Sequence, residues 1–584
     1  MPLSVSEATA LLTAPGQPFE VGEEVIDGIV TRVWAHCPPS LRSILELSRG
    51  HGQQTFLVYE DERLSFEEHF AEAAAFATAL HDRFGVRLGD RVAIAMRNFP
   101  EWVVAFWAAA AVGAVVVPLN AWWTGPELAY GIEDSGSKLV VLDRERLDRL
   151  GDHLDGLRRA GLGDVVLARG DDPAGQGREA AASSERPAAG VWRMEEVLDE
   201  HRRPVAESEL PDLTVSPDDL ATIFYTSGTT GRPKGALGTQ RNICTNLMSL
   251  GFISARVQLT SSEEHRESLS GGPVQNSYLL SVPLFHATGC HSILVANTAA
   301  GGKLVMMRRW NAERALELIE REKITVFGGV PTMAWQVIQS PEFESRDTSS
   351  VRSVAYGGAP APPELLRDIR EHFPGGSASN GYGLTETSSV TTMNSGEDYF
   401  RKPDSVGPPV PVVEIRIVGP DGDDVAEGET GELLIKGPNV VKGYWNKPEA
   451  TAESFTEGWL HSGDVARVDE EGFVYIVDRA KDMVIRGGEN VYCVEVESAI
   501  FEHPAVSDAA VIGVPHDVLG EEVGAVVVLK PGASLGEEEL REHLAARIAG
   551  FKIPSHVWYL EEQLPRNPAG KVLKRQLREL VLGQ

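Results

Sequence analysis

The sequence predicts an α/β protein with a large N-terminal domain of parallel sheets and flanking helices, a small barrel-like part, and a small C-terminal α+β domain. Three observations predict this organisation. Short apolar segments alternate with helical patterns over most of the chain, which is typical of parallel sheets covered by helices on both faces. Between residues 412 and 436 the pattern changes to alternating strands with Gly/Asp turns, and after Asp478 strand and helix alternate again. With 584 residues, the chain is also too long for one ordinary domain.

Apolar runs between turn residues place the strands of the large domain, and the stretches between them carry helical patterns. The predicted strands cover residues 91–96, 114–117, 137–143, 220–224, 277–283, 303–307, 324–328 and 351–356. The predicted helices include residues 100–112, 311–321 and 363–372. Two polar stretches, residues 170–190 and 258–276, have the composition of surface loops.

Acidic residues strongly outnumber basic residues. Asp and Glu total 85, Lys and Arg total 54, and the formal net charge is −31. Nucleic acids and anionic lipid surfaces attract a basic field, so this balance argues against both as partners. A few cations and backbone N–H groups can still form a positive pocket for a small anion inside an acidic shell. The expected partners are therefore small molecules.

One uncharged stretch, residues 102–119, is 18 residues long and reaches the lower limit for a membrane span. Its alanines, Gly113 and Pro118 favour a buried helix followed by a short strand, so no transmembrane segment is predicted. The first 17 residues lack a basic start followed by an apolar core, so no signal peptide is expected. The four cysteines are far apart and lack metal-ligand spacing, and we interpret them as reduced thiols of a cytoplasmic protein: Cys37, Cys244, Cys290 and Cys493.

A loop of small polar residues before a lysine is the first chemical signal. The string TSGTTGRPKG covers residues 226–235 and follows the apolar strand at 220–224. Glycines let backbone N–H groups approach phosphate oxygens, hydroxyl groups add donors, and Lys234 adds a mobile positive charge. The spacing is not that of the Walker P-loop. The full string resembles the signature loop of the adenylate-forming (ANL) superfamily, which includes acyl-CoA synthetases, peptide-synthetase adenylation domains and beetle luciferases.

Five further segments resemble the remaining motifs of this superfamily and occur in the same order. They are GGAP at 357–360, NGYGLTET at 380–387, GWLHSGD at 458–464, DRAKDMVIRGGEN at 478–490 and PRNPAGK at 565–571. The likeness extends from about residue 91 to residue 571, and the complete set is far more specific than any one motif. By resemblance the chain is identified as a member of the superfamily, similar to the bacterial fatty-acid and other AMP-forming acyl-CoA synthetases.

The resemblance implies that ATP and Mg²⁺ bind at these motifs. The residues expected to bind ATP are Thr226, Ser227, Gly228, Thr229, Thr230 and Lys234 for the outer phosphates, and Gly357, Gly358, Ala359, Pro360, Asn380, Gly381 and Tyr382 for adenine. Asp464, which only accepts hydrogen bonds when ionised, is expected at the ribose together with Arg479. Glu386 is the expected Mg²⁺ ligand, because a hard cation is often held by one carboxylate together with phosphates and water.

Formation of an acyl-adenylate brings a carboxylate to the α-phosphorus of ATP, so the site must neutralise two approaching anions. By resemblance, Lys571 bridges the carboxylate and the α-phosphate, and Thr385 donates a hydrogen bond to the α-phosphate. His286 lies in a segment that resembles the lining of the acyl site, where it is expected near the carboxylate. The residues expected to be catalytic are thus Lys571, Thr385, Glu386 and His286.

The acyl-adenylate needs a nucleophile, and coenzyme A is the expected acceptor. Only 13 residues follow Lys571, which is too few for a carrier domain. Gly487 and Gly488 resemble the loop of coenzyme A ligases and would let a thin pantetheine arm pass. Lys552 resembles a position that can meet coenzyme A phosphates. Two alternatives are an acyl-AMP ligase that loads a separate carrier protein and a catalytically silent nucleotide sensor.

The resemblance also implies two domains that move relative to one another. Residues 1–480 would form the large domain that binds AMP and the acyl group, and residues 482–584 a small mobile domain that carries Lys571. Lys481 would be the hinge, about which the small domain rotates after adenylation. The oligomeric state is left open, with a homodimer among the alternatives.

Two segments resemble walls of the acyl pocket, PLFHATG at 283–289 and GVPTM at 329–333. Most of their residues are small or apolar, and no Arg or Lys stands there to meet a second carboxylate. A monocarboxylic acid with an apolar chain is expected, and a medium- to long-chain fatty acid is the leading candidate. Aryl acids and steroid side-chain acids stay open, because pocket depth cannot be read from the sequence.

Overall fold

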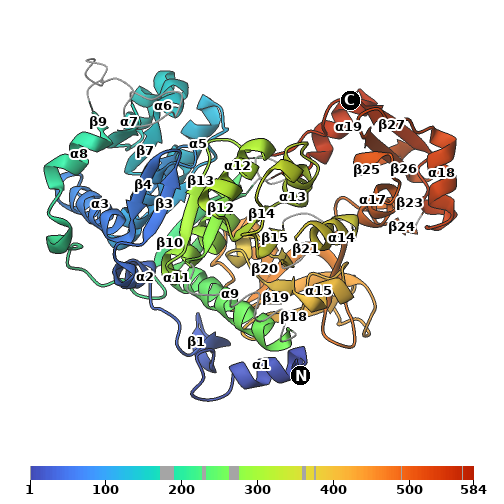
Figure 1. Ribbon diagram of the computed structural model, residues 1–584, viewed down its shortest axis with the longest axis horizontal. Helices are drawn as coiled ribbons and strands as arrows, with labels where there is room; N and C mark the ends of the chain where they lie inside the picture. Colours follow the sequence, from blue (N-terminus) through green and yellow to red (C-terminus); the bar gives the residue numbers. More distant parts are fainter. Residues whose placement is uncertain are drawn as a thin grey trace.

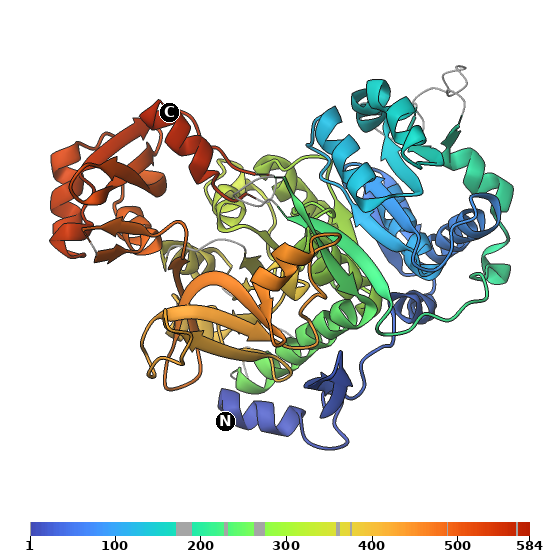
Figure 2. The ribbon, with the colours of Figure 1, turned by 180° about the vertical axis from the view of Figure 1, so that it is seen from behind.

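The computed structural model describes residues 2–170, 190–226, 232–261, 275–357, 363–373, 376–487, 489–567 and 570–583. Two large sheets and a smaller antiparallel sheet make up most of the N-terminal part, and a further sheet forms the C-terminal part (Figure 1). Near the N-terminus, helix α1 (Val5–Leu12) precedes a hairpin of β1 (Val21–Ile26) and β2 (Ile29–Trp34). The C-terminal part projects to one side of the molecule in both views (Figure 2).

The first large sheet has seven strands in the order β11-β10-β6-β5-β7-β8-β9. They are β5 (Arg91–Ala95), β6 (Val115–Pro118), β7 (Leu139–Asp143), β8 (Asp164–Ala168), β9 (Val191–Arg193), β10 (Leu220–Thr226) and β11 (Lys234–Thr239). Neighbouring strands are parallel except at one edge, where β10 and β11 form an antiparallel pair. The predicted phosphate loop connects this pair.

The second large sheet has eight strands in the order β17-β16-β15-β14-β12-β13-β3-β4. They are β3 (Thr55–Tyr59), β4 (Glu62–Ser65), β12 (Ser277–Leu280), β13 (Lys303–Met306), β14 (Val326–Gly329), β15 (Ser353–Gly357), β16 (Ser377–Tyr382) and β17 (Thr392–Ser395). The strands from β3 to β16 are parallel, and β4 and β17 add antiparallel edges. The carboxyl ends of the parallel strands therefore meet at one edge, where ligands bind in open α/β sheets.

Helices flank and join the two large sheets. They include α2 (Leu41–Ser48), α3 (Phe66–Thr78), α4 (Pro100–Ala111), α5 (Gly125–Ser135), α6 (Arg144–Leu150), α7 (Leu154–Arg159), α8 (Met194–His201), α9 (Gln240–Thr260), α11 (Ala296–Ala300), α12 (Ala312–Glu322), α13 (Pro331–Ile338), α14 (Pro363–His372) and α15 (Glu397–Arg401). A π-helical segment, η5 (Thr288–Val295), precedes α11. Every residue of α4 is buried, within a core cluster that also contains residues of α3, α9 and β12.

The uncharged stretch at 102–119 is therefore a core element. A helix that is apolar on all sides is suited either to a membrane or to the interior of a large protein, and α4 lies in the interior. Within the described ranges, none of the helices is both long and apolar enough to span a membrane.

The third sheet is small and antiparallel, as the alternating pattern near residues 412–436 predicts. Its path is β18-β19-β21-β20, and β22 pairs with β21. The strands are β18 (Glu414–Val418), β19 (Gly431–Lys436), β20 (Phe455–Thr456), β21 (Trp459–Val468) and β22 (Val474–Arg479), with helix α16 (Pro448–Ser454) before β20. The register of β21 and β22 sets Asp464 opposite Arg479.

The C-terminal sheet follows the path β24-β23-β26-β25, and β27 pairs with β26. Its strands are β23 (Val484–Arg486), β24 (Glu489–Val491), β25 (Val506–His516), β26 (Gly520–Leu529) and β27 (His556–Leu560), and its helices are α17 (Cys493–Phe501), α18 (Glu537–Ala545) and α19 (Lys574–Leu582). The chain passes from the third sheet to this one between Arg479 and Val484, a stretch that contains Lys481. The domain limits and the hinge stay predictions.

The predicted fold class is confirmed, and several strands are one to three residues shorter than predicted. The strand predicted at 277–283 ends at Leu280. Pro283 has no N–H to donate to a sheet, and the Asn98 side chain binds the backbone on both sides of it. Asn98 Nδ2 donates to the Val282 carbonyl at 3.0 Å, and its Oδ1 accepts from Leu284 N–H at 2.9 Å. These bonds hold the segment that leads into the predicted acyl wall.

Candidate active site

Asp464 and its two partners form a buried group that the sequence assigns to the ribose. Asp464 is 2% exposed on β21, and its Oδ1 lies 3.1 Å from Arg479 Nε. Tyr382, at the end of β16, donates a hydrogen bond from its hydroxyl to Asp464 Oδ2 at 2.6 Å. Burial and the neighbouring carboxylate raise the pKa of Tyr382 well above its ordinary value, so the phenol stays protonated. Both oxygens of Asp464 are thus held in fixed directions.

Glu386 lies in a one-turn helix, η7 (Thr385–Thr387), next to a tyrosine that the sequence analysis missed. The Tyr444 hydroxyl donates to Glu386 Oε1 at 2.7 Å. Lys234 Nζ lies 5.0 Å from the centroid of the Tyr444 ring. Burial, and then the charge of Glu386, raise the pKa of Tyr444. Tyr444 therefore connects the predicted Mg²⁺ ligand with the predicted phosphate-binding lysine.

The ends of the phosphate loop are fixed by the β10–β11 pair. Thr226 ends β10, Lys234 begins β11, and the two are register partners. The strand that follows the loop is further anchored because Trp445 N–H donates to the Gly235 carbonyl of β11 at 2.8 Å. Several predicted site residues lie outside the described residues: Ser227, Gly228, Thr229, Thr230, Gly358, Ala359, Pro360 and Gly488.

The described residues that are predicted to bind adenine lie on the neighbouring strands β15 and β16. Gly357 ends β15 and pairs with Gly381 of β16, while Asn380 pairs with Tyr356. A Cβ built on Gly357 would lie 2.6 Å from the Gly381 carbonyl oxygen, so only glycine fits this close approach. These strand ends stand beside Tyr382 and hence beside the Asp464 group.

The lysine loop reaches this group from the C-terminal part. Gly570 has a φ of +82°, and a Cβ there would lie 2.6 Å from a methyl group of Val330, so the loop packs on the predicted acyl wall. Lys571 N–H donates to Asn567 Oδ1 at 2.9 Å. Burial, and then the charge of Arg479, lower the pKa of Lys571 to about 8, while Asp482 and Asp464 act in the opposite direction. Lys571 therefore lies within the field of the Asp464–Arg479 pair.

The two predicted acyl walls are tightly built. A Cβ on Gly289 would lie 2.2 Å from the Pro283 carbonyl oxygen, and a Cβ on Gly329 would lie 2.8 Å from Met333 Sδ. His286 Nε2 is buried without a hydrogen-bond partner in the described part of the chain. Burial lowers the pKa of His286 to about 4, so the ring is neutral at ordinary pH. At the predicted position beside the substrate carboxylate, His286 would therefore supply an uncharged ring and no positive charge.

The residues predicted to receive coenzyme A lie elsewhere on the C-terminal part. Gly487 is exposed in the turn between β23 and β24, where its N–H donates to the Leu519 carbonyl at 2.8 Å. Lys552 Nζ is 2.7 Å from both carboxylate oxygens of Glu495, so its charge is already paired. Lys481 is exposed. The roles predicted for these three residues stay predictions.

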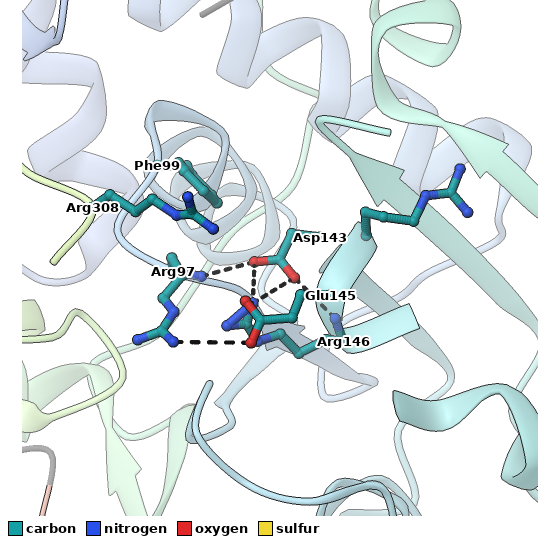
Figure 3. A pocket seen from close by; sticks show the side chains of 7 residues that line it. Arg97, Phe99, Asp143, Glu145, Arg146 and Arg308 are labelled. Atoms are coloured by element: carbon teal, nitrogen blue, oxygen red, sulfur yellow. Dashed lines mark hydrogen bonds and ion pairs between the residues drawn. The ribbon is translucent and has the colours of Figure 1, made fainter. Parts of the chain in front are cut away.

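Four arginines surround a pocket at the carboxyl edge of the sheets, which the sequence analysis did not identify. The pocket is lined by Arg97, Phe99, Asp143, Arg144, Glu145, Arg146 and Arg308 (Figure 3). Arg146 Nη1 binds both oxygens of Asp143 at 2.9 Å, and Arg97 Nη2 is 4.0 Å from Glu145. Arg97 Nε and Arg146 Nη2 are buried without a hydrogen-bond partner among the described residues. Four arginines thus line the pocket together with two carboxylates, although Arg144 Nε donates to the Gly170 carbonyl at 3.3 Å, in a chain whose net charge is −31.

The family follows from comparison with known proteins. The family model for the AMP-binding enzyme matches residues 46–445, and the model for the AMP-binding enzyme C-terminal domain matches residues 495–571. The chain belongs to the AMP-binding enzymes. Because the first match alone spans more than half of the chain, the resemblance read from the motifs is confirmed at the level of the family.

Relatives of this AMP-binding enzyme are CoA ligases. Feruloyl-CoA synthase of Amycolatopsis sp. is 35% identical over 515 residues, covering 88% of this chain and 93% of that protein. Long-chain-fatty-acid–CoA ligase FadD13 of Mycobacterium tuberculosis is 34% identical over 524 residues, covering 89% and 93%. A solved structure of o-succinylbenzoate coenzyme A synthetase of Bacillus subtilis with ATP and magnesium has 31% identity and a TM-score of 0.73, covering 93% and 99%.

This AMP-binding enzyme is an AMP-forming acid–CoA ligase that uses ATP, Mg²⁺ and coenzyme A. Glu386 is the single carboxylate predicted to hold a magnesium ion that arrives with the nucleotide. Within the described ranges, no group of three or more His, Cys, Asp or Glu residues could hold a metal ion by itself. A single carboxylate such as Glu386, completed by phosphate oxygens and water, is the usual arrangement for this cation. The cytoplasmic location and the oligomeric state stay predictions.

Proposed function

We propose that this ligase activates a monocarboxylic acid with an apolar chain, with a medium- to long-chain fatty acid as the first candidate. The observation that carries this proposal is the uncharged lining of the two predicted acyl walls. Ala287 and Val330 are buried there, and Met333 packs on Gly329. His286 adds a neutral ring, so a second substrate carboxylate would find no compensating charge among these residues.

An aryl acid is the second candidate, supported by the likeness to feruloyl-CoA synthase. The test is a panel of dodecanoate, hexadecanoate, ferulate and succinate, with pyrophosphate release and thioester formation measured for each acid. We expect the highest kcat/KM for a fatty acid. A higher value for ferulate would replace the first candidate by the second, and a higher value for succinate would overturn both.

For the first half-reaction we propose that Lys571 neutralises the meeting anions. One carboxylate oxygen of the acid attacks the α-phosphorus, and pyrophosphate leaves. Asp464, aligned by Tyr382 and Arg479, would accept hydrogen bonds from the ribose hydroxyls. Lys234 and the hydroxyl of Thr385 would bind phosphate oxygens, and Glu386 would hold Mg²⁺, which supplies charge neutralisation.

For the second half-reaction we propose that the small domain rotates about Lys481. The lysine loop stands at the Asp464 group, whereas Gly487 is exposed, which supports an arrangement suited to adenylation. Rotation would withdraw Lys571 and bring Gly487 and Gly488 to the acyl-adenylate. The coenzyme A thiol would then attack the acyl carbon, and AMP would leave with the bonding electrons of the cleaved C–O bond.

We also propose that the arginine pocket binds phosphates of coenzyme A. Arg97 precedes Asn98, whose side chain binds the backbone around Pro283, so the pocket borders the predicted acyl segment. The Arg97 guanidinium lies 5.5 Å from the ring of Trp122, which is 51% exposed. A cation beside an open aromatic face suits a nucleotide, because phosphate and base can be bound together.

The test of this pocket compares coenzyme A with pantetheine, which lacks the nucleotide. Arg97→Gln should raise the KM for coenzyme A about tenfold, the usual effect of one charged hydrogen bond, and leave the KM for pantetheine unchanged. ATP–pyrophosphate exchange should stay normal. Arg541→Gln, which removes a charge on α18, is the control and should change neither value. Equal changes for both thiols in Arg97→Gln would contradict the assignment.

A further inference from the structure

Two consecutive residues directly after the predicted Mg²⁺ ligand have a left-handed backbone. Ser388 has a φ of 56° and Ser389 a φ of 109°, in a turn that follows Glu386 by two residues. Non-glycine residues in such conformations are strained and persist only where surrounding contacts hold them. A Cβ built on Gly383 would lie 1.4 Å from the Ser389 carbonyl oxygen, so this turn rests directly on the backbone of the central motif.

Three side chains hold the turn in place. His291 Nδ1 lies 3.1 Å from the Ser388 carbonyl oxygen, and Ser292 Oγ donates to Ser389 Oγ at 2.7 Å. Asn246 Oδ1 accepts from Val390 N–H at 3.0 Å. Because a carbonyl oxygen only accepts, His291 Nδ1 carries the proton in this contact. His291 is 2% exposed, and burial lowers its pKa to about 4, so the ring is neutral and holds this one tautomer.

His291 also connects this turn with two other parts of the site. His291 and Ser292 lie on η5, the π-helical segment that begins right after Ala287 of the acyl wall. The His291 ring meets the Phe224 ring edge-on, with centroids 4.9 Å apart, and Phe224 lies on β10 two residues before Thr226. π-Helical turns are found frequently at functional sites. The segment thus packs between the phosphate-loop strand and the turn that follows Glu386.

We propose that His291 and Ser292 are positioning residues for the magnesium-dependent step: they hold the left-handed pair Ser388–Ser389 and thereby fix the direction of the Glu386 carboxylate. Neither side chain needs to contact substrate. The inference rests on the proposed role of Glu386 as Mg²⁺ ligand. If the inference is correct, loss of the hydrogen bond donated by His291 changes the response to Mg²⁺ more than it changes binding of the acid.

The experiment measures ATP–pyrophosphate exchange over a range of Mg²⁺ concentrations. His291→Phe keeps a ring against Phe224 but removes the donor to Ser388. We expect the half-maximal Mg²⁺ concentration to rise about fivefold, which corresponds to the loss of one hydrogen bond. The KM for the acid and the rate of thioester formation from added acyl-AMP should change by less than about twofold. His291→Asn retains a donor near the position of Nδ1 and should restore the Mg²⁺ response.

A matched control separates positioning from general stability. His69 on α3 is also fully buried and meets the Phe56 ring edge-on at 4.8 Å. His69→Phe should therefore lower thermal stability comparably and leave the Mg²⁺ response unchanged. An equal shift in His69→Phe, or no shift in His291→Phe, would overturn the inference. If His291→Phe does not fold, Ser292→Ala takes its place with the same expected direction of the Mg²⁺ shift.

Glu386→Gln distinguishes this inference from the function on which it rests. If Glu386→Gln leaves the Mg²⁺ response unchanged, the proposed ligand role fails, and the positioning inference fails with it. If Glu386→Gln raises the half-maximal Mg²⁺ concentration and the His291 and Ser292 variants do not, only the positioning inference fails. A rise in all of these variants, with rescue by His291→Asn, supports both.

Discussion

The lysine loop and the glycine loop belong to the same small C-terminal part, yet their surroundings differ. Lys571 is half-buried beside the Asp464–Arg479 pair, and its neighbour Gly570 packs on Val330 of the large part. Gly487, on the turn between β23 and β24, is exposed. Among the described residues of the two loops, Gly570 and Lys571 are therefore engaged with the site, whereas Gly487 is exposed. Under the roles proposed for the two loops, this arrangement suits adenylation rather than thioester formation, so variants of the two loops should separate the two half-reactions.

The largest expected effect comes from Lys571→Ala. Loss of a charge that acts mainly in the transition state should lower the rate of acyl-AMP formation by about 10²–10³. Thioester formation from added acyl-AMP should stay close to normal, because the lysine loop is proposed to act only in the first half-reaction. Both rates are measured separately, with Arg575→Ala, an exposed cation on α19, as the control. An equal fall in the rates of both half-reactions would contradict the proposal that the two loops act in different half-reactions.

Gly488→Leu should produce the opposite pattern. A bulky side chain in the glycine loop would obstruct the pantetheine path and lower the rate of thioester formation by about 10², as expected for a misplaced reactant. ATP–pyrophosphate exchange should persist. Normal turnover with coenzyme A in this variant would show that the thiol enters by another route.

The pH dependence of adenylation sharpens the assignment of Lys571. Its pKa of about 8 lies below the ordinary lysine value, so the ammonium loses its proton as the pH rises through about 8. The kcat/KM for ATP reports the free enzyme and should fall toward a tenfold loss per pH unit above that value. Lys571→Arg keeps its charge, so its profile should be flat over the same range. A falling profile in both proteins would assign the titration to another group.

The smallest effect is expected for Tyr444→Phe, which tests the link between Glu386 and Lys234. Removing the hydroxyl deletes the 2.7 Å hydrogen bond to Glu386 and should raise the half-maximal Mg²⁺ concentration about fivefold. Tyr492→Phe serves as the control, because it removes an exposed hydroxyl whose contact is with Thr430 Oγ1, at 3.3 Å. If the KM for the acid changes while the Mg²⁺ response does not, Tyr444 acts in binding the acid and not in binding magnesium.

Most of the candidate site residues could be predicted from short sequence motifs, because each motif lies at or near the end of a strand. Asp464 and Arg479 come from separate motifs, and strand register brings them together. Tyr444 lay outside any motif. It reaches Glu386 because an isolated bridge to Ala236 ties its loop to β11, a contact that hydrophobic periodicity does not reveal.

Charge distribution in space was the second feature that sequence reasoning missed. Arg97 and Arg308 follow β5 and β13, Arg146 lies in α6 just after β7, and only the shared carboxyl edge of the sheets gathers them. The net charge of −31 conceals this local excess of cations. Lys552 shows the reverse case: its sequence context suggested an open cation, whereas Glu495, 57 residues away, pairs with it.

The buried helix α4 has a consequence for the synthesis of this protein. Its core cluster includes Leu280 and Leu294, which follow the end of α4 by about 170–180 residues. At roughly 5–20 residues per second, a ribosome needs on the order of 10–40 s to add them. During this interval the uncharged stretch at 102–119 has left the ribosome without part of its final covering. The same apolar surface that anchors the finished core therefore stays incompletely covered while the chain is still growing.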